Sequence, residues 1–444
     1  MGVGRRSVAV AVATGFVLLG GVAGAGPASP ATGRLASPPV EDGTPPPPNA
    51  CKYLDKANVR SGLLTGDVLA ARTWPQNRIG YLDVHRYTRG RGVVVAVVDS
   101  GVDGRHPQLR GAVQRGVDVT RATPVAGADT DCAAHGTAVA GIIAARPVPG
   151  TGLVGIAPEA TILPIRHLWG VSRYGSATSA PAEALLRGLR TAVTSRVSIV
   201  NVSVSVAAET LTAAQRAEFA RLARVAEAND ILVVVASGNR DEYENKNPTT
   251  YPAALSTVSP VVMAVSGVRE NGRPDENSIT GPFVSVAAPD WNVPCPLDHG
   301  GVVLCRGTSF GTPFVAGLAA LVRSRFPELR AAEVRARIQA TADRPAADVP
   351  DPRVGFGVID PMAALTAVLP PAALPSEPVP ARPLQPAPSD EAMRRTTTAV
   401  VAGSVGLVAL VLAGWATARR GRRRRWRPGP GAGSRTPVAE TVGR

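Results

Sequence analysis

The sequence GTSFGTPFVAG at residues 307–317 decides how the rest of this chain is interpreted. Ser309 lies between glycines where a helix of small and apolar residues begins, and Pro313 suits a first helical turn. Its hydroxyl could simply cap that helix. A helix start also presents backbone N–H groups that can hold an anion, so Ser309 is equally well placed to be a nucleophile beside a developing oxyanion.

Two further segments supply the partners that a serine nucleophile needs. Six apolar residues, Val93–Val98, lead into Asp99, and His135 directly precedes a helical run of small residues. Taken alone, the carboxylate could cap a loop and the imidazole could be a structural hydrogen-bonding group. Taken together they predict a triad, because a serine hydroxyl needs a base and the resulting imidazolium needs a carboxylate. Asp99, His135 and Ser309 are therefore the predicted catalytic residues.

A fourth segment supplies a donor for the oxyanion that serine attack creates. The sequence VVVASGN at residues 233–239 is a buried strand that ends in a glycine turn and an amide side chain. The Asn239 amide and the backbone N–H of Ser309 are predicted to form the oxyanion hole. Losing one such donor typically costs ~3–4 kcal/mol of transition-state stabilisation.

The region 74–369 alternates apolar strand-like runs with longer helical patterns, which indicates an α/β domain whose parallel sheet is covered on both faces. Functional groups in such sheets gather beyond the carboxyl ends of the strands. The predicted strands are Val93–Val98, Ile162–Ile165, Ser198–Val204, Ile231–Ala236, Val261–Val265 and Phe283–Ala287. The predicted helices are Thr137–Ala145, Ala182–Val193, Ala213–Ala228, Thr312–Arg325 and Ala331–Ala340.

The two ends of the chain predict its compartment. Residues 1–25 have the charged, apolar and small-residue parts of a secretory signal peptide. Residues 399–418 contain no charge, and a helix of that length would span about 30 Å, the thickness of a hydrocarbon core. The basic segment 419–444 follows, so the catalytic domain is expected outside a single-pass cell-membrane anchor, with the C-terminus in the cytoplasm. Proline-rich segments, an N-terminal extension at 26–73 and a stalk at 370–398, flank the domain.

The formal charge of +14 does not indicate a nucleic-acid-binding protein. Nine arginines and one glutamate lie from Arg419 onward, so most of the basicity belongs to the tail. A polybasic tail next to an apolar span serves as a stop signal and a lipid-headgroup anchor. Membrane is therefore an expected partner and nucleic acid is not.

Four cysteines in an exported chain favour two disulfides among three possible connectivities. Cys295 and Cys305 are close in sequence and could staple the loop ahead of Ser309, which would leave Cys51 to pair with Cys132. The long loop would contribute about 4–5 kcal/mol and the short one about 3 kcal/mol on chain-entropy grounds. No CxxC arrangement is present in the sequence, and neither a metal site nor a cofactor is expected.

The order Asp, His, Asn, Ser in the motifs DSG, HGTAVAG, ASGN and GTSFGTPFVAG resembles the subtilisin-like serine proteases over residues 74–366. The resemblance implies a three-layer α/β sandwich with a central, mostly parallel sheet. It implies that Asp99 orients the base, His135 is general base and then general acid, and Ser309 is the nucleophile. It also assigns Asn239 to the oxyanion hole and makes His106 a structural histidine. His85, His167 and His299 match no motif, and surface or structural roles are expected for them.

A closer resemblance is to the mycosins, membrane-anchored subtilisin-like proteases of actinobacterial type VII secretion systems. It rests on the signal peptide, the short extension with a cysteine, the serine motif, the stalk and the apolar span with its arginine tail. It implies polypeptide substrates and a secretion membrane complex as partners, with a role in processing exported proteins or in stabilising the complex. The alternatives are a structural subunit with ancillary protease activity, or a general degradative protease tethered to the envelope.

Departures from the subtilisin pattern alter further expectations. Gln108 replaces the acidic calcium ligand of many relatives, which argues against that calcium site. The short, proline-rich extension argues against a separately folded inhibitory propeptide and favours a segment wrapped on the domain. Ser205 replaces a common glycine in the presumed substrate-edge segment. The predicted substrate-binding residues are small, which implies limited side-chain selectivity; they are Val204, Ser205, Ala236, Ser237 and Gly238.

Overall fold

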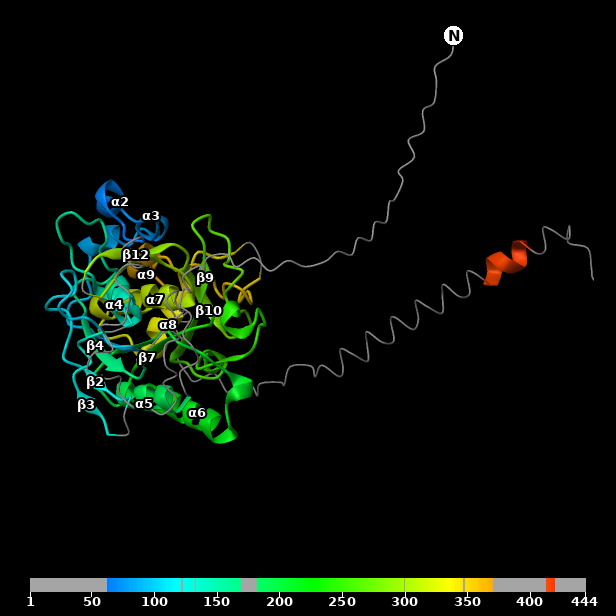
Figure 1. Cartoon of the computed structure of the whole chain (residues 1–444), viewed down its shortest axis with the longest axis horizontal. Helices are drawn as coiled ribbons and strands as arrows, with labels where there is room; N and C mark the ends of the chain where they lie inside the picture. The colour runs from blue at the N-terminus through cyan, green and yellow to red at the C-terminus, as the bar shows by residue number, and fades with distance from the viewer. Residues whose placement is uncertain are drawn as a thin grey trace, which may run out of the picture. The chain divides into compact units, whose positions relative to one another are not determined.

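The structure is a computed structural model, and it describes residues 62–120, 123–131, 133–168, 182–298, 300–345, 348–369 and 413–419 (Figure 1). Its centre is an eight-stranded sheet in the order β10-β9-β7-β5-β1-β4-β2-β3. Adjacent strands run parallel, except that β2 and β3 are antiparallel. The strands are β1 Val94–Asp99, β2 Val117–Asp118, β3 Val125–Ala126, β4 Thr161–Arg166, β5 Ile199–Val202, β7 Leu232–Ala236, β9 Val262–Val268 and β10 Val284–Pro289.

The middle strands form the core, because helices cover both faces of the sheet. Every residue of β5, β7, β9 and β10 is buried, as a parallel sheet between two helical layers requires. The helices α4 (His135–Ala144) and α7 (Thr308–Arg325) pack on one another and on one face. The helices α5 (Ala182–Val193) and α6 (Ala213–Ala228) pack on the other face (Figure 1). The predicted α/β architecture is confirmed.

The amphipathic helices have the predicted bounds, while the two helices at the site begin earlier. α5, α6 and α8 (Ala331–Ala340) have the expected bounds, but α4 begins at His135 and α7 at Thr308. The expectation that Pro313 occupies a first turn is therefore wrong, since it lies inside α7. A proline there cannot donate to the carbonyl four residues earlier, which is that of Ser309.

Several short elements were not predicted. A hairpin joins β11 (Val293–Pro296) to β12 (Val302–Cys305), and a second small sheet joins β6 (Val206–Ala207) to β8 (Thr250–Tyr251). Short helical turns complete the domain: α2 Gly66–Ala70, α3 Trp74–Ile79, η2 Asp83–Arg86, η3 Ala208–Thr210, η4 Arg240–Tyr243, η5 Ala253–Thr257 and α9 Pro361–Thr366. Their two- to six-residue lengths are too short for hydrophobic periodicity to show them.

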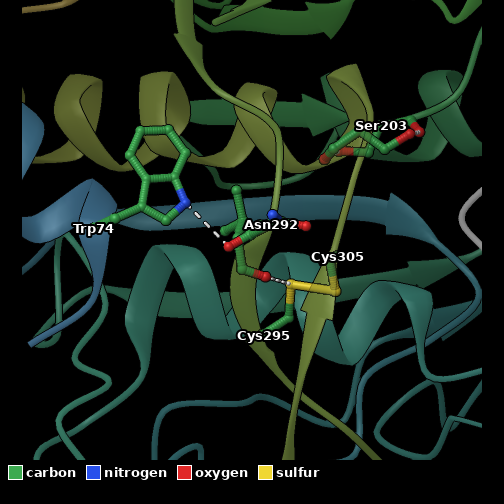
Figure 2. Close-up of a disulfide and its surroundings, with 7 residues drawn as sticks. Trp74, Ser203, Asn292, Cys295 and Cys305 are labelled. Carbon is green, nitrogen blue, oxygen red and sulfur yellow. Dashed lines mark hydrogen bonds between the residues drawn. A yellow bond between two sulfur atoms is a disulfide. The ribbon is translucent and has the colours of Figure 1, made fainter. Parts of the chain in front are cut away.

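The hairpin β11–β12 carries a disulfide and receives the N-terminal segment. Cys295 and Cys305 are bonded across it, as Figure 2 shows, so this predicted pair is present. The indole of Trp74 donates to the carbonyl of Asn292 at 3.0 Å (Figure 2), and Leu64 N–H donates to Val302. The described end of the predicted extension therefore packs on the domain. Cys51 and Cys132 lie outside the described residues, and their pairing stays a prediction.

The predicted membrane span falls mostly on residues that the structure does not describe. Residues 413–419 are helical, and residues 399–412 lie outside the described part of the chain. Within the described part, no helix has the length and apolar character needed to cross a membrane. The predicted signal peptide, stalk and basic tail also lie outside it, apart from Arg419.

Candidate active site

Three neighbouring strands end at one edge of the sheet, where the predicted site residues lie. Asp99 is the last residue of β1, Ser203 follows β5, and Asn239 lies three residues beyond the end of β7. These strands are parallel neighbours, so their carboxyl ends lie side by side. Charged and amide groups can therefore gather here without interrupting the apolar strands below.

His135 reaches this edge because α4 begins at it. Ala134 just before it has the left-handed conformation, with φ of 64°, so the chain turns sharply into the helix. The buried Asp131 carboxylate holds that turn by accepting hydrogen bonds from Ala133 N–H, Ala134 N–H and Ser100 Oγ. Its second oxygen accepts from both the N–H and the hydroxyl of Thr137. The start of α4 is thus anchored on a single carboxylate.

Asp99 and His135 form a buried hydrogen-bonded pair. His135 Nδ1 lies 2.8 Å from Asp99 Oδ1 and 3.0 Å from Oδ2, so the other ring nitrogen, Nε2, is the one available to a substrate-side group. Burial disfavours the charged ring, but the Asp99 carboxylate, with Asp131 and Glu242 adding to it, raises the pKa of His135 above its usual value. Nε2 is buried and has no hydrogen-bond partner in the described part of the structure.

Ser309 is the second residue of α7 and is held through Ser203. The Ser309 hydroxyl donates to the Ser203 carbonyl at 2.8 Å, and Ser203 Oγ donates back to the Ser309 carbonyl at 2.8 Å. That carbonyl is free to accept because Pro313 has no N–H to give it. The Ser309 hydroxyl is therefore not hydrogen-bonded to His135 Nε2 in the structure. A rotation about its Cα–Cβ bond turns the hydroxyl away from Ser203.

Asn239 is oriented by Thr308, the residue before the serine. Its Oδ1 accepts from the Thr308 N–H at 2.9 Å and from the Thr308 hydroxyl at 3.1 Å, which leaves Nδ2 as the outward donor. Gly307 adopts φ of 110°, and a Cβ there would lie 3.1 Å from the Asn239 amide, so only glycine leaves that amide room. Nδ2 donates to Glu242 Oε1 at 2.7 Å.

The predicted substrate-binding residues lie beside this site on two segments. Val204 and Ser205 connect β5 to β6, and Ala236 ends β7 before Ser237 and Gly238. The two segments touch, because a Cβ on Gly238 would lie 2.8 Å from Ser205 Oγ. The Ser205 hydroxyl also lies 3.0 Å from the hydroxyl of Tyr243. All five predicted residues are buried and adjoin the site, and their role in substrate binding stays a prediction.

Gln108 lies in a different part of the domain and is engaged by protein groups. Its amide donates to the Leu153 carbonyl at 2.7 Å, and the Gln76 amide donates to the neighbouring Gly152 carbonyl at 2.9 Å. Within the described residues no group of three or more potential ligands that could hold a metal ion was found.

The other histidines do not take part in the Asp99–His135 hydrogen bond. His106 accepts from the Gln108 N–H, and His85 Nε2 lies 2.9 Å from the Ile156 carbonyl. His167 is buried against the Asp99 main chain, and burial lowers its pKa to about 4. His299 lies outside the described residues.

Four residues that sequence reasoning did not assign complete the site. They are Asp131, Ser203, Thr308 and Glu242, each of which is hydrogen-bonded to a predicted site residue or to the turn that carries one. Position in the motifs could have indicated two of them, since Asp131 stands four residues before His135 and Thr308 directly precedes Ser309. Glu242 carries no such signal, because only the η4 turn brings it back to Asn239.

Comparison with known proteins gives the class of protein that this fold and site define. A model of the Subtilase family matches residues 90–357, a span that contains the three predicted catalytic residues and Asn239. The chain therefore belongs to the subtilase family and is a subtilisin-like serine endopeptidase.

Relatives of known identity place the chain more narrowly. It is 33% identical to Mycosin-1 of Mycobacterium tuberculosis over 440 residues, which cover 90% of this chain and 97% of that protein. The crystal structure of MycP1 from the ESX-1 type VII secretion system is similar with a TM-score of 0.60 and 29% identity, over 72% of this chain and 92% of that one. A chain of an intact ESX-5 inner membrane complex matches with a TM-score of 0.59 and 28% identity, over 80% and 93%. Within the subtilase family, the chain is therefore a relative of the mycosins.

Proposed function

We propose that this chain is a membrane-anchored endopeptidase that hydrolyses exported polypeptides at a type VII secretion membrane complex, with Asp99, His135 and Ser309 as its catalytic triad. The observation that carries the chemistry is the buried Asp99–His135 hydrogen bond at the sheet edge that Ser309 also reaches. An imidazole that is hydrogen-bonded to a carboxylate can take the proton of a nearby hydroxyl, and it thereby activates this otherwise weak nucleophile.

The reaction begins when the Ser309 hydroxyl turns from the Ser203 carbonyl toward His135 Nε2. Nε2 takes the hydroxyl proton as Oγ attacks the scissile carbonyl carbon, and Asp99 stabilises the imidazolium that forms. The imidazolium then gives its proton to the leaving amine, which departs and leaves an acyl ester on Ser309. Water attacks this ester with His135 again as base, which releases the acid and restores the serine.

The oxyanion of each tetrahedral intermediate would lie between Asn239 Nδ2 and the backbone N–H of Ser309. The second donor is one of the first four N–H groups of α7, which have no partner within the helix. The first donor is fixed in advance by the two hydrogen bonds from Thr308. Donors that are oriented before the reaction stabilise the transition state without further reorganisation.

The substrate would lie against the segments Val204–Ser205 and Ala236–Gly238. Small residues line this region, and the Ser205 and Tyr243 hydroxyls contact one another across it. Small lining residues of this kind support limited selectivity for the side chains of the substrate.

Replacement of Ser309 by alanine tests the catalytic assignment. Peptide hydrolysis by the purified full-length chain should fall by about 10⁶-fold, with the far-UV circular dichroism spectrum and the midpoint of thermal unfolding retained. Ser324→Ala, near the other end of α7, is the matched control and should keep full activity. Undiminished hydrolysis by Ser309→Ala would contradict the assignment.

The proposed location rests on the signal peptide, the uncharged segment 399–418 and the relatives. The ESX-5 structure is described as an intact inner membrane complex, and this chain covers 93% of the matching component. A cysteine-labelling experiment in cells tests the topology. A reporter cysteine in the domain should react with a membrane-impermeant maleimide, whereas one in the tail 419–444 should react only after permeabilisation.

A structural subunit with ancillary protease activity is the second candidate. It is favoured by the ESX-5 match and by the resting site, in which both Ser309 Oγ and Asn239 Nδ2 are held by other protein groups. Secretion by cells carrying Ser309→Ala is compared with secretion by cells lacking the gene. If only the deletion abolishes secretion, scaffolding is the main role; equal loss in both assigns the role to proteolysis.

A further inference from the structure

The Glu242 carboxylate accepts a hydrogen bond from Asn239 Nδ2, the predicted donor of the oxyanion hole. It lies on the η4 turn (Arg240–Tyr243), directly after Asn239, and its Oε1 accepts from Asn239 Nδ2 at 2.7 Å. The other amide atom, Oδ1, is already saturated by the two hydrogen bonds from Thr308. Nδ2 therefore cannot turn over to escape the contact, and Glu242 occupies the outward donor of the predicted oxyanion hole.

The surroundings of Glu242 make this contact sensitive to proton binding. The titratable and charged groups that face the turn are Arg240, Asp241 and Tyr243 on η4, Glu209 on η3 and His135 at the start of α4. Burial raises the pKa of Glu242 to about 7, and the nearby Asp241 carboxylate raises it further. The hydrogen bond from Asn239 and the positive charge of His135 both act to lower this pKa. The ionised form holds Nδ2 more strongly, because hydrogen bonds to a charged acceptor are the strong ones.

We propose that Glu242 is an internal competitor for the oxyanion-hole donor, so that the site stabilises its transition state fully only when the Glu242 carboxylate releases Asn239. Two effects combine in the competition. The donor must be withdrawn from one anion before it can serve another, and an ionised carboxylate beside the hole repels the oxyanion. Glu242 acts through Asn239 and is a positioning residue. The inference rests on the proposed function, since it assigns regulation to the same site.

The competition gives kcat/KM two opposing pH dependences. Activity rises with pH as His135 becomes neutral, and it falls again as Glu242 ionises near pH 7. Glu242→Gln keeps the size of the side chain but removes the charge. Its kcat/KM should exceed that of the unmodified chain about 10-fold or more at pH 8.5, approach it at pH 5.5, and lack the descending limb.

The experiment measures the rate at which diisopropyl fluorophosphate labels Ser309, followed by intact mass from pH 5.5 to 9 on the full-length chain in detergent. This probe needs no knowledge of the substrate, and its phosphoryl oxygen occupies the oxyanion hole. Glu244→Gln is the matched control, since its side chain is exposed on the same loop and pairs with Lys246. It should label at the unmodified rate at every pH.

A double-mutant cycle shows whether Glu242 acts through the amide. In an Asn239→Ala background, Glu242→Gln should give a clearly smaller gain, because the charge repulsion remains but there is no amide donor left to release. An equal gain with Asn239 absent, or equal labelling rates for Glu242→Gln and the unmodified chain at every pH, would overturn the inference while leaving hydrolysis by Ser309 intact. Failure of every form to be labelled, together with no loss of peptide hydrolysis in Ser309→Ala, would instead contradict the proposed function itself.

Discussion

At the scale of single residues, each group assigned to the chemistry is held by a neighbour that performs none. Thr308 orients the Asn239 amide, Asp131 fixes the turn that carries His135, and the Ser203 carbonyl accepts from the Ser309 hydroxyl. These contacts are short and buried, so a substitution that leaves one polar atom unpaired costs more than the hydrogen bond itself contributed. The supporting residues should therefore affect stability and catalysis together.

The first prediction concerns the ionisation of His135. Because its pKa is raised, the charged ring predominates until the pH exceeds the usual value near 6.5, and the ascending limb of kcat/KM should have its midpoint above that value. The stability that the Asp99–imidazolium pair contributes is present at low pH and is lost as the pH rises through the raised pKa. Hydrolysis of a peptide substrate measured from pH 5 to 9 gives the midpoint.

Asp99→Asn is the variant that checks the cause. Without the carboxylate, burial is the dominant effect, so the midpoint should move to lower pH while kcat falls on the order of 10⁴-fold. An ascending limb that stays in place in this variant would show that another group titrates.

The second residue-scale prediction concerns Asp131. Alanine there removes the acceptor for five hydrogen bonds at the start of α4, and the free energy of unfolding should fall by about 2–4 kcal/mol. Because His135 is the first residue of that helix, kcat should fall more than KM rises. Urea unfolding followed by fluorescence and steady-state kinetics measure the two effects.

Asp129→Ala is the matched control for Asp131, since Asp129 lies two residues earlier and is only half-buried. Both its stability and its kcat should remain within experimental error of the unmodified chain. Equal losses in the two variants would mean that the loop, and not the Asp131 carboxylate, positions His135.

At the scale of elements, periodic helices were predictable to the residue and the site-bearing helices were not. α6 has a capping box, in which the Thr212 and Gln215 side chains bond each other's backbone, and an amphipathic pattern that marks both of its ends. α7 is buried from Thr308 to Val322, so no polar face marks its start, and Pro313 suggested a later one. The predicted triad rests on local motifs, and the structure places Asp99 beside His135. The Glu242–Asn239 contact depends instead on a four-residue turn whose geometry has no sequence period.

The loop between α4 and β4 gives the element-scale prediction. Gln76 and Gln108 donate their amides to the Gly152 and Leu153 carbonyls, so two uncharged side chains hold this loop without a metal ligand at position 108. Calcium chelation should leave the midpoint of thermal unfolding unchanged. Gln108→Ala should lower the free energy of unfolding by about 1–3 kcal/mol, because it leaves a buried carbonyl unpaired.

Scanning calorimetry with EDTA and with added calcium makes this measurement. A midpoint that falls by several degrees in EDTA and recovers on addition of calcium would contradict the prediction. Gln114→Ala, at an exposed position outside this loop, is the matched control and should leave the unfolding midpoint unaltered.

At the scale of the whole molecule, the described contacts close the domain at both ends. The segment before Trp74 packs on the β11–β12 hairpin through Leu64, which brings the N-terminal side of the chain to the disulfide. On the C-terminal side, the Arg337 guanidinium on α8 donates to the carbonyls of Ala364 and Ala367 at 2.6 and 2.7 Å. The contacts of the peptidase domain therefore extend at least to Ala367, shortly before the proline-rich sequence begins.

At the scale of the whole molecule, we therefore predict that catalysis and membrane anchoring can be separated by truncating the chain. A chain that stops after Leu369 keeps both Arg337 contacts and the whole sheet, but it lacks the predicted stalk and the uncharged segment 399–418. It should leave the membrane fraction and hydrolyse peptides with kcat/KM within about 2-fold of the full chain. A chain that stops after Asp360 removes α9 and the acceptors of Arg337, and it should unfold at lower temperature by several degrees. Membrane retention of the first truncation would show that the domain itself binds the membrane or a membrane protein, and would reassign the anchor from residues 399–418 to a surface of the fold.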